Sequence, residues 1–285
     1  MQPTVGVVVP AYHPDPGRLR SYLRAIRETI DPAELRVELD LPNETPPSDT
    51  LSGDTRPGDE PDPSPDSAPL DLPDGVDCHV VRRRRGKGGA VTAGFEALST
   101  DVYAFADADG ATPASSLADV LAPVCDGDAD LAAGSRRHPD SVVRSHQTFA
   151  RRFLGDGFAW IARRLLDAEL YDYQCGAKAV TATAWERIRG HLYEPGFAWD
   201  IELVAVAGAL DCRIAEVPIA WEDQPGSTVS PVGDTLDMGR GLLVARHRAR
   251  IIRDNRLHRL IDREDGVALI DRLDDRGAVS DGGDP

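Results

Sequence analysis

Lysine is nearly absent from this chain. Of the 32 lysines and arginines among its 285 residues, only Lys87 and Lys178 are lysines, and 48 aspartates and glutamates oppose them. The formal net charge at pH 7 is −16. A general nucleic-acid binder neutralises phosphates with a basic surface, so this charge argues against that class of protein. We therefore expect no nucleic-acid partner.

The acidic, lysine-poor and arginine-using composition resembles that of proteins from salt-loving archaea. A net charge of −16 makes the chain repel itself at low ionic strength, and high salt would screen that repulsion. An ordinary acidic cytosolic protein is the alternative, and the composition leaves it open.

Clustered cysteines and long apolar runs are also missing. The four cysteines lie far apart, form no Cys-x-x-Cys pair and have no histidine cluster beside them, which argues against a zinc site or a disulfide framework. No signal sequence precedes Val5, and no run approaches the roughly 20 apolar residues of a membrane-spanning helix. We expect a soluble or peripheral protein.

What the chain does contain is an alternation of short apolar runs and amphipathic segments. This pattern predicts an α/β fold with a mostly parallel sheet covered by helices on both faces. The length fits one large domain or two small ones. We predict strands at residues 5–10, 35–39, 77–81, 102–106, 131–135, 177–180 and 214–219, and helices at 18–30, 88–98, 144–166 and 236–260.

Two segments interrupt this pattern. Residues 41–74 are rich in Pro, Asp, Ser, Gly and Thr and have almost no large apolar side chain. Such a segment cannot bury enough surface to offset its ordering entropy, so we predict a disordered acidic insertion within a domain at residues 1–260. Residues 261–285 are predicted to form an acidic, partly disordered tail.

The most informative stretch is the apolar run at 102–106 and the sequence Asp107-Ala108-Asp109-Gly110 that follows it. Open α/β sheets bind ligands at the carboxyl ends of their strands. Two aspartates there can hold a divalent cation, which in turn can hold a diphosphate. The alternative is a pair of solvated turn carboxylates.

Seven motifs occur along the chain in an order that resembles the family 2 inverting glycosyltransferases of the Rossmann-like GT-A fold. More narrowly, they resemble the dolichyl-phosphate glucose and mannose synthases. The likeness runs from about Val5 to Arg253, outside the insertion. The motifs are VVPAY at 8–12, RGKGGAV at 85–91, DADGATP at 107–113, AGSR at 133–136, DYQCGAK at 172–178, FAWDIE at 197–202 and EVPIAW at 216–221.

The resemblance implies a metal-dependent, inverting transfer of a hexose from a nucleoside-diphosphate sugar to dolichyl (polyprenyl) phosphate, feeding protein N-glycosylation or other glycan assembly. It implies Mg²⁺ or Mn²⁺ held mainly by Asp109 with Asp107 nearby, because a cation stabilises the leaving diphosphate. A UDP-sugar is favoured over a GDP-sugar. The other donor-binding residues it implies are Pro10, Tyr12, Asp40, Lys87 and Gly88.

The donor motif departs from the family at one position. Family members usually have paired aspartates where this chain has Leu39-Asp40-Leu41-Pro42, so a single carboxylate remains for the base and ribose. Asp40 as a plain strand-end cap is the alternative, and the identity of the nucleotide stays open. Lys87 and Gly88 open a helix, whose N-terminus favours phosphate; a surface lysine at a glycine-rich helix start is the alternative there.

On the acceptor side, the resemblance gives catalytic roles to Arg136, Asp172 and Asp200, besides Asp109. Arg136 offers a fork for the diphosphate or the acceptor phosphate, with a surface ion pair as the alternative. Asp172 would hold Arg136 or sugar hydroxyls. The acceptor and sugar contacts implied are Gln174, Lys178 and Glu202, with a buried ion pair as the equal alternative for Lys178.

The role of Asp200 depends on the acceptor. A sugar hydroxyl needs a general base, whereas a phosphate monoester, with a second pKa of roughly 6, is already largely an anion at neutral pH. Asp200 would therefore be the base for a hydroxyl acceptor, and would orient the sugar or an arginine for a phosphate acceptor. A helix N-terminal carboxylate with no further role is the third interpretation.

Two arginine-rich segments, at 144–164 and 240–259, interleave basic with aromatic or aliphatic residues. This pattern suits the anionic surface of a membrane, and predicts a cytoplasmic protein that is peripheral at the inner face of the cell membrane. Core-packing helices with solvated arginine faces are the alternative.

Three other functions are alternatives to this interpretation. A family 2 enzyme that adds sugar to a saccharide or a lipid-linked glycan hydroxyl is the nearest. A sugar-nucleotide pyrophosphorylase usually has a Gly-rich loop with Arg and Lys after its first strand, where this chain has residues 10–14, PAYHP. A non-catalytic sugar-nucleotide or lipid-binding module would not need both the aspartate pair and the acceptor motif.

Overall fold

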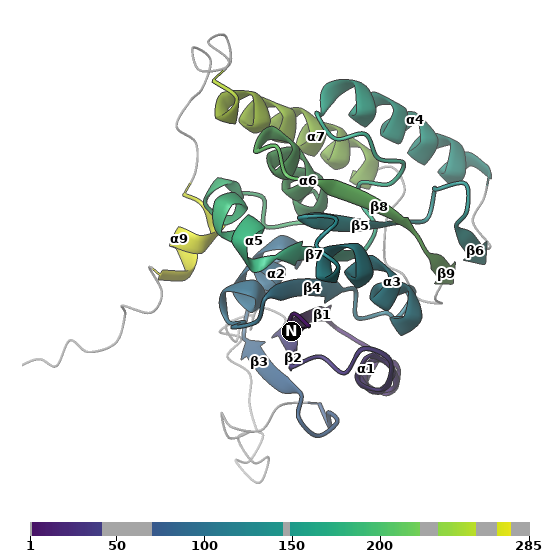
Figure 1. Cartoon of the computed structure of the whole chain (residues 1–285), viewed down its shortest axis with the longest axis vertical. Coiled ribbons are helices and arrows are strands. Elements are labelled where there is room, and N and C mark those ends of the chain that lie inside the picture. Colours follow the sequence, from purple (N-terminus) through teal and green to yellow (C-terminus); the bar gives the residue numbers. More distant parts are fainter. Residues whose placement is uncertain (1, 42–69, 145–148, 223–232, 255–266, 275–285) are drawn as a thin grey trace, which may run out of the picture.

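The computed structural model of the chain describes residues 2–41, 70–144, 149–222, 233–254 and 267–274 (Figure 1). Most of the predicted insertion, the last residues of the helix predicted to reach 260, and the end of the predicted tail therefore lie outside the described residues.

A seven-stranded sheet forms the centre of the protein, in the order β3-β2-β1-β4-β7-β5-β8 (Figure 1). Neighbouring strands are parallel except β7, which is antiparallel to both β4 and β5. The predicted mostly parallel sheet is thus confirmed. The strands are β1 (Val5–Tyr12), β2 (Glu34–Asp40), β3 (Asp77–Val81), β4 (Val102–Ala106), β5 (Leu131–Ser135), β7 (Ala177–Thr181) and β8 (Ile214–Pro218), and a second, two-stranded parallel sheet pairs β6 (Val142–Arg144) with β9 (Ala220–Glu222).

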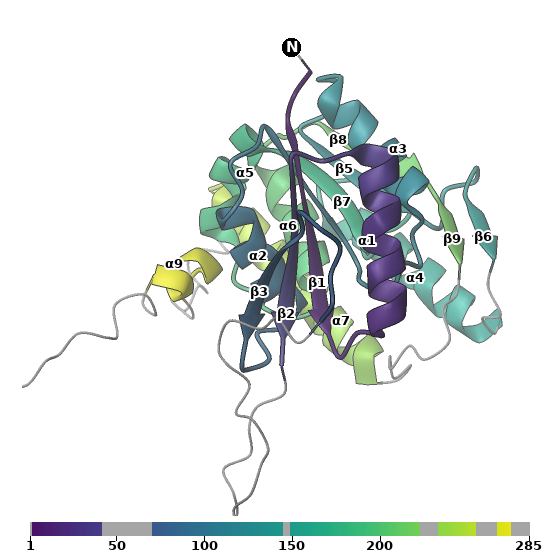
Figure 2. The same ribbon diagram turned by 90° about the horizontal axis from the view of Figure 1, so that it is seen from below.

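Helices cover both faces of the central sheet, and Figure 2 shows α1 lying along one of them. α1 (Pro16–Ile30) and α3 (Ala114–Cys125) share a core with Val7 and Val9 of β1. Val8 points into the opposite core. Alternate side chains of a strand face opposite sides of a sheet, so one apolar run supplies both cores. The second core contains residues of α2 (Lys87–Glu96), α4 (Phe149–Leu165), α5 (Ala182–Ile188), α6 (Trp199–Ala209), α7 (Gly233–Ile252) and α9 (Leu269–Asp274), and a 3₁₀ turn, η1 (Arg189–His191), follows α5.

The antiparallel strand β7 decides which motifs meet. β1, β2, β4 and β5 end at the same edge of the sheet because they are parallel. β7 runs the other way, so its first residue, Ala177, pairs with the last residue of β4, Ala106. The motif that precedes β7 therefore lies beside the aspartates that follow β4.

The end of the predicted insertion belongs to the fold. Leu70 and Leu72 are half-buried against the core that contains α1. Between them, the carboxylate of Asp71 forms an ion pair with Arg20 of α1 at 2.7 Å. At the other end, Leu41 donates its N–H to the carbonyl of Val81 at 2.8 Å. Within the described residues, both ends of the segment predicted at 41–74 therefore contact the rest of the protein through apolar residues.

The predicted tail also contributes to the fold in part. Ala268 and Leu269 are buried, and the N–H of Leu269 donates to the carbonyl of Leu192 at 2.8 Å. The described part of this segment, around α9, therefore packs against the domain that was expected to end at residue 260.

We expect a short Gly-Ser linker in place of residues 42–69 to leave the free energy of unfolding unchanged. Replacing residues 41–74 should lower it by about 2 kcal/mol, because two half-buried leucines lose their packing. Urea unfolding of both variants measures the difference. Equal stability of the two variants would contradict the anchoring role of Leu70 and Leu72.

Candidate active site

A chain of four alternating charges lies at the carboxyl edge of the sheet. The ammonium of Lys178 is 2.6 Å from one carboxylate oxygen of Asp200, and the ammonium of Lys87 is 2.8 Å from the other. Lys87 also lies 3.0 Å from Asp107. Both lysines of the chain therefore meet at a single carboxylate.

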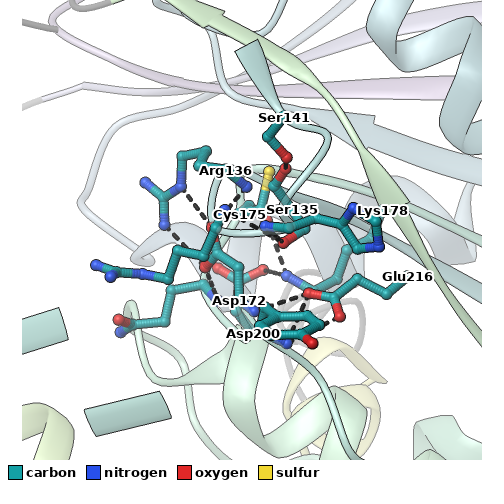
Figure 3. A network of polar contacts seen from close by, with 12 residues as sticks. Ser135, Arg136, Ser141, Asp172, Cys175, Lys178, Asp200 and Glu216 are labelled. Carbon is teal, nitrogen blue, oxygen red and sulfur yellow. Dashed lines mark hydrogen bonds and ion pairs between the residues drawn. The ribbon is translucent and has the colours of Figure 1, made fainter. Parts of the chain in front are cut away.

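These charged groups are buried, so each needs an oppositely charged partner to offset the cost of removing it from water. The exposed fraction of the side chain is 2% for Asp200, 1% for Lys178 and 8% for Lys87. Burial alone would raise the pKa of Asp200, but the charges and hydrogen bonds of Lys178 and Lys87 bring that pKa below its usual value. Asp200 is therefore an anion with both oxygens engaged (Figure 3 shows it with Lys178).

The glycines around Lys87 serve close packing within the protein. Gly86 precedes α2 at a φ of +83°, and a side chain there would overlap the carbonyl of Pro195. A Cβ on Gly88 would lie 2.5 Å from the carbonyl of Glu194. The missing side chain of Gly88 thus makes room for the segment that leads into α6, and its expected donor contact stays a prediction. That approach brings Lys87 to Asp200.

The two aspartates after β4 occupy different surroundings. Asp107 is held by its N–H, which donates to the carbonyl of Gly176 at 2.9 Å, and a side chain on Gly176 would overlap the Asp107 carboxylate. Asp109 is exposed and accepts the N–H of Ala111 at 2.9 Å. Desolvation and the charge of Asp107 raise the pKa of Asp109. The glycine of the acceptor motif is therefore needed to admit Asp107.

The donor set at this point fits a divalent cation. Asp107 and Asp109 are the two carboxylates that follow β4. Within the described ranges, no three or more His, Cys, Asp and Glu side chains group to hold a metal ion. Mg²⁺ is commonly held by one or two carboxylates, with phosphate oxygens and water as the other ligands. The hydroxyl of Tyr22 adds to the fit: it is buried, has no hydrogen-bond partner among the described residues, and its pKa is raised by burial and by both aspartates.

Arg136 and Asp172 form the other part of the site (Figure 3). The guanidinium donates through Nε at 2.6 Å and Nη2 at 3.0 Å to the two carboxylate oxygens, a bidentate pair. The N–H of Gln174 adds a bond at 3.0 Å. Burial opposes the charge of Asp172, but the charge of Arg136 and these bonds hold the pKa of Asp172 well below its usual range. Arg136 itself is 29% exposed and can reach a ligand.

At the donor end, the ring of Tyr12 is exposed at the end of β1 and lies 4.7 Å from the guanidinium carbon of Arg84. Pro10 is within β1, which runs two residues further than predicted. Asp40 is buried. One of its carboxylate oxygens accepts the backbone N–H of Arg85 at 2.5 Å, and the other accepts the Arg85 side-chain Nε at 2.7 Å. The carboxylate of Asp40 thus binds an arginine of the chain and is not presented free to a base or ribose.

The network around Arg85 was not predicted from the sequence. Its Nη1 lies 2.8 Å from Glu38, which is fully buried in β2 and also accepts from Arg36 and contacts His79. A glutamate in the middle of an apolar strand was the available signal. A buried carboxylate needs a cationic partner, and the arginine run at 82–85 could have supplied it.

Two predicted sugar contacts have other partners. The side-chain amide of Gln174 contacts the sulfur of Met238 in α7. Glu202 is buried and accepts the N–H groups of Tyr193 and Glu194 at 2.9 and 2.8 Å, and it pairs with Arg248. These bonds tie α6 to the loop before it and to α7, so the expectation that Glu202 binds sugar is not supported by its contacts.

Comparison with known sequences finds similarity over part of the chain. Residues 62–174 match the sequence model of Glycosyl transferase family 2. Glycosyltransferase AglD of Haloferax volcanii is 34% identical over 163 residues, which are 56% of this chain and 25% of that protein. Dolichyl-phosphate beta-glucosyltransferase of Mus musculus is 34% identical over 180 residues, 61% of this chain and 56% of that protein. The chain thus spans a quarter and about half of these two relatives.

Comparison with solved structures concerns the fold. Glucosyl-3-phosphoglycerate synthase from Mycobacterium tuberculosis, solved with Mn²⁺, UDP-glucose and phosphoglyceric acid, superposes with a TM-score of 0.56. The match covers 86% of this chain and 80% of that one at 16% sequence identity. At this identity the likeness shows the fold, and it confirms the predicted GT-A architecture.

The pairing of Arg136 with Asp172 predicts a pH-dependent loss of stability in Asp172→Asn. A carboxylate whose pKa is lowered by folding stabilises the protein above its unfolded pKa, and this contribution is lost as the pH falls through the folded value. We expect the variant to be about 2 kcal/mol less stable at pH 7. The difference in unfolding free energy between the variant and the unchanged protein should become smaller below about pH 4. Urea unfolding at several pH values measures it, with the exposed Asp126→Asn as control; a gap that stays constant to pH 3 would contradict the pairing.

Proposed function

We propose that the chain transfers a hexose, specifically glucose, from UDP-glucose to dolichyl (polyprenyl) phosphate with inversion. The match of residues 62–174 to the sequence model of Glycosyl transferase family 2 supports the transfer of a glycosyl group. Glucose and the dolichyl-phosphate acceptor are supported by the names of the relatives, among them the mouse dolichyl-phosphate beta-glucosyltransferase. A uridine nucleotide is supported by the structural neighbour solved with UDP-glucose.

The observation that carries the acceptor assignment is the state of Asp200. A general base works best with a pKa near the working pH and with a free oxygen for the proton. Asp200 has a lowered pKa, and each of its oxygens contacts a lysine ammonium. A phosphate acceptor needs no base, because it is already an anion. The geometry therefore favours phosphate over a sugar hydroxyl.

Arg136 supplies what a phosphate acceptor does need. Its bonds to Asp172 use Nε and Nη2, so Nη1 is the nitrogen left to donate to a phosphate oxygen. Asp172 fixes the plane of the guanidinium, and an oriented arginine loses less side-chain entropy when it binds. In this proposal Arg136 binds the acceptor phosphate and Asp172 positions Arg136.

On the donor side, Asp107 and Asp109 would hold Mg²⁺ or Mn²⁺, which would act as a Lewis acid for the leaving diphosphate. Lys87 places a fixed positive charge 3.0 Å from Asp107, where it can contribute to neutralising the diphosphate. Tyr12, exposed at the end of β1, offers a ring face for the uracil base.

Peripheral contact with the inner face of the cytoplasmic membrane is supported by α4. Trp160 and Ile161 are 58% and 46% exposed, and the guanidinium of Arg164 lies 4.8 Å from the Trp160 ring. An exposed aromatic side chain beside arginine suits an anionic lipid surface. Within the part of the chain that the structure describes, none of the helices has the length and apolar character to cross a bilayer.

The acceptor assignment predicts the relative cost of two substitutions. We expect purified protein to transfer radiolabel from UDP-glucose, within a panel of UDP- and GDP-sugars, to polyprenyl phosphate. Arg136→Ala should lower kcat/KM for polyprenyl phosphate by roughly 10–100-fold, the value of a hydrogen bond between charged groups. Asp200→Asn should cost less, and lipid-extractable counts measure both.

Asp200→Asn also leaves two buried ammonium groups short of a carboxylate, so its melting temperature must be compared with that of the unchanged protein. A general base contributes about 10²–10⁴-fold. If folded Asp200→Asn loses that much while Arg136→Ala is nearly silent, the acceptor is a hydroxyl. The enzyme would then add sugar to a saccharide or a lipid-linked glycan.

The metal assignment predicts that Asp109→Asn abolishes transfer, because an amide supplies no charge to a hard cation. Loss of the protein-bound Mn²⁺ signal in electron paramagnetic resonance should accompany the loss of activity. Asp126→Asn, at an exposed carboxylate, is the matched control. Full activity of Asp109→Asn in EDTA would refute the assignment.

A further inference from the structure

We propose that Glu216 is a positioning residue for the acceptor: its carboxylate fixes the backbone of the loop before β7 and thereby aims the Asp172–Arg136 pair. The loop in question is residues 166–176, called the acceptor loop below. The inference rests on the proposed function only for the nature of the acceptor.

The contacts of Glu216 carry the argument (Figure 3). One of its oxygens accepts the N–H of Tyr171 at 2.7 Å and the N–H of Asp172 at 2.9 Å. Its other oxygen also accepts from Tyr171, at 2.8 Å. Two successive backbone N–H groups thus converge on one carboxylate, an arrangement that fixes both peptide planes through charge-assisted bonds.

The acceptor loop needs such an anchor because it forms neither helix nor strand. Its N–H groups have no ladder partners, and a buried N–H without a partner is costly. Elsewhere in the loop, the carbonyl of Leu170 accepts from Arg163 at 2.7 Å, and the Tyr173 hydroxyl donates to the carbonyl of Ala168 at 2.6 Å. Glu216 supplies the anchor for Asp172, the residue that holds Arg136.

The sheet places the three charged residues of this unit on neighbouring segments. Arg136 follows β5, and Glu216 lies in β8, which pairs with β5 in parallel with Ala133 opposite Glu216. The acceptor loop contacts both segments: Glu216 accepts the backbone N–H of Asp172, and Arg136 donates to the Asp172 carboxylate. A change at Glu216 should therefore reach the acceptor through Asp172 and Arg136.

Glutamine is the sharpest substitution at this position. Glu216→Gln keeps the shape of the side chain and one acceptor oxygen, but it turns an NH₂ donor toward backbone N–H groups. Asp130→Asn is the matched control, because Asp130 also accepts a backbone N–H, that of Arg213 at 2.8 Å. Asp130 and Arg213 precede β5 and β8, so the control loosens the same two strands at their opposite end.

A double-mutant cycle separates positioning from general stability. We expect Glu216→Gln to lower kcat/KM for polyprenyl phosphate about tenfold, with the KM for the sugar nucleotide unchanged. In an Arg136→Ala background, Glu216→Gln should have almost no effect on kcat/KM, because the arginine through which Glu216 acts on the acceptor is already removed. Additive losses, or an equal loss in Asp130→Asn, would overturn the proposal.

Amide hydrogen exchange gives a readout that needs no turnover. Peptides covering residues 167–176 should exchange faster in Glu216→Gln than in the unchanged protein or in Asp130→Asn. Unchanged exchange overturns the proposal whatever the substrate. If exchange is faster but the unchanged protein transfers no sugar to polyprenyl phosphate, the proposed function is rejected. The double-mutant cycle is then measured with the acceptor that the enzyme does use. Additive losses with that acceptor would again overturn the positioning role.

Discussion

The buried carboxylate of Asp200 is the point on which the site is assembled. Asp200 lies in the first turn of α6, Lys87 begins α2 and Lys178 lies in β7. One side chain therefore joins three elements that are distant in sequence. Removing one partner from a buried ion pair leaves an uncompensated charge, which is strongly destabilising. The three elements are therefore held in one arrangement, and the position of Lys87 beside Asp107 follows from it.

The same contact explains why a chain that otherwise uses arginine retains two lysines. Arginine presents a wide planar fork, whereas lysine ends in a compact ammonium with three donors. Lys178 contacts both Asp200 and the carbonyl of Cys175, at 2.6 and 2.8 Å, while almost fully buried. Lys87 divides its ammonium between two carboxylates in the same way. A compact ammonium therefore fits these closely packed positions better than a guanidinium, and arginine is used at the other basic positions of the chain.

The sheet and the location of the site could be predicted from the sequence, because both follow from local patterns. Apolar runs that end in Asp107 and in Arg136 predict strands whose carboxyl ends carry polar groups. The partners of those groups could not be predicted. Lys178 was as compatible with acceptor binding as with a buried pair, and only the antiparallel direction of β7, which no local pattern reveals, brings it to Asp200.

Other differences have similarly specific causes. The helix α3 was not predicted, although Leu117, Val120, Leu121 and Val124 recur at helical spacing, because Pro123 and two serines weaken the pattern. Asp40 was expected to be a ligand contact or a cap, and the structure shows it holding Arg85. That pairing joins β2 to the segment before α2 across 45 residues. Composition could not reveal such a long-range contact.

The burial of both lysines has a consequence for covalent chemistry. Reagents that modify amines need an accessible, unprotonated nitrogen, and the side chains of Lys87 and Lys178 are 8% and 1% exposed and ion-paired. The folded domain therefore offers almost no reactive ε-amine to acylating labels or amine cross-linkers. Opening of the core around Asp200 would expose both amines together. The rate at which acyl groups attach to them therefore reports how often that core opens.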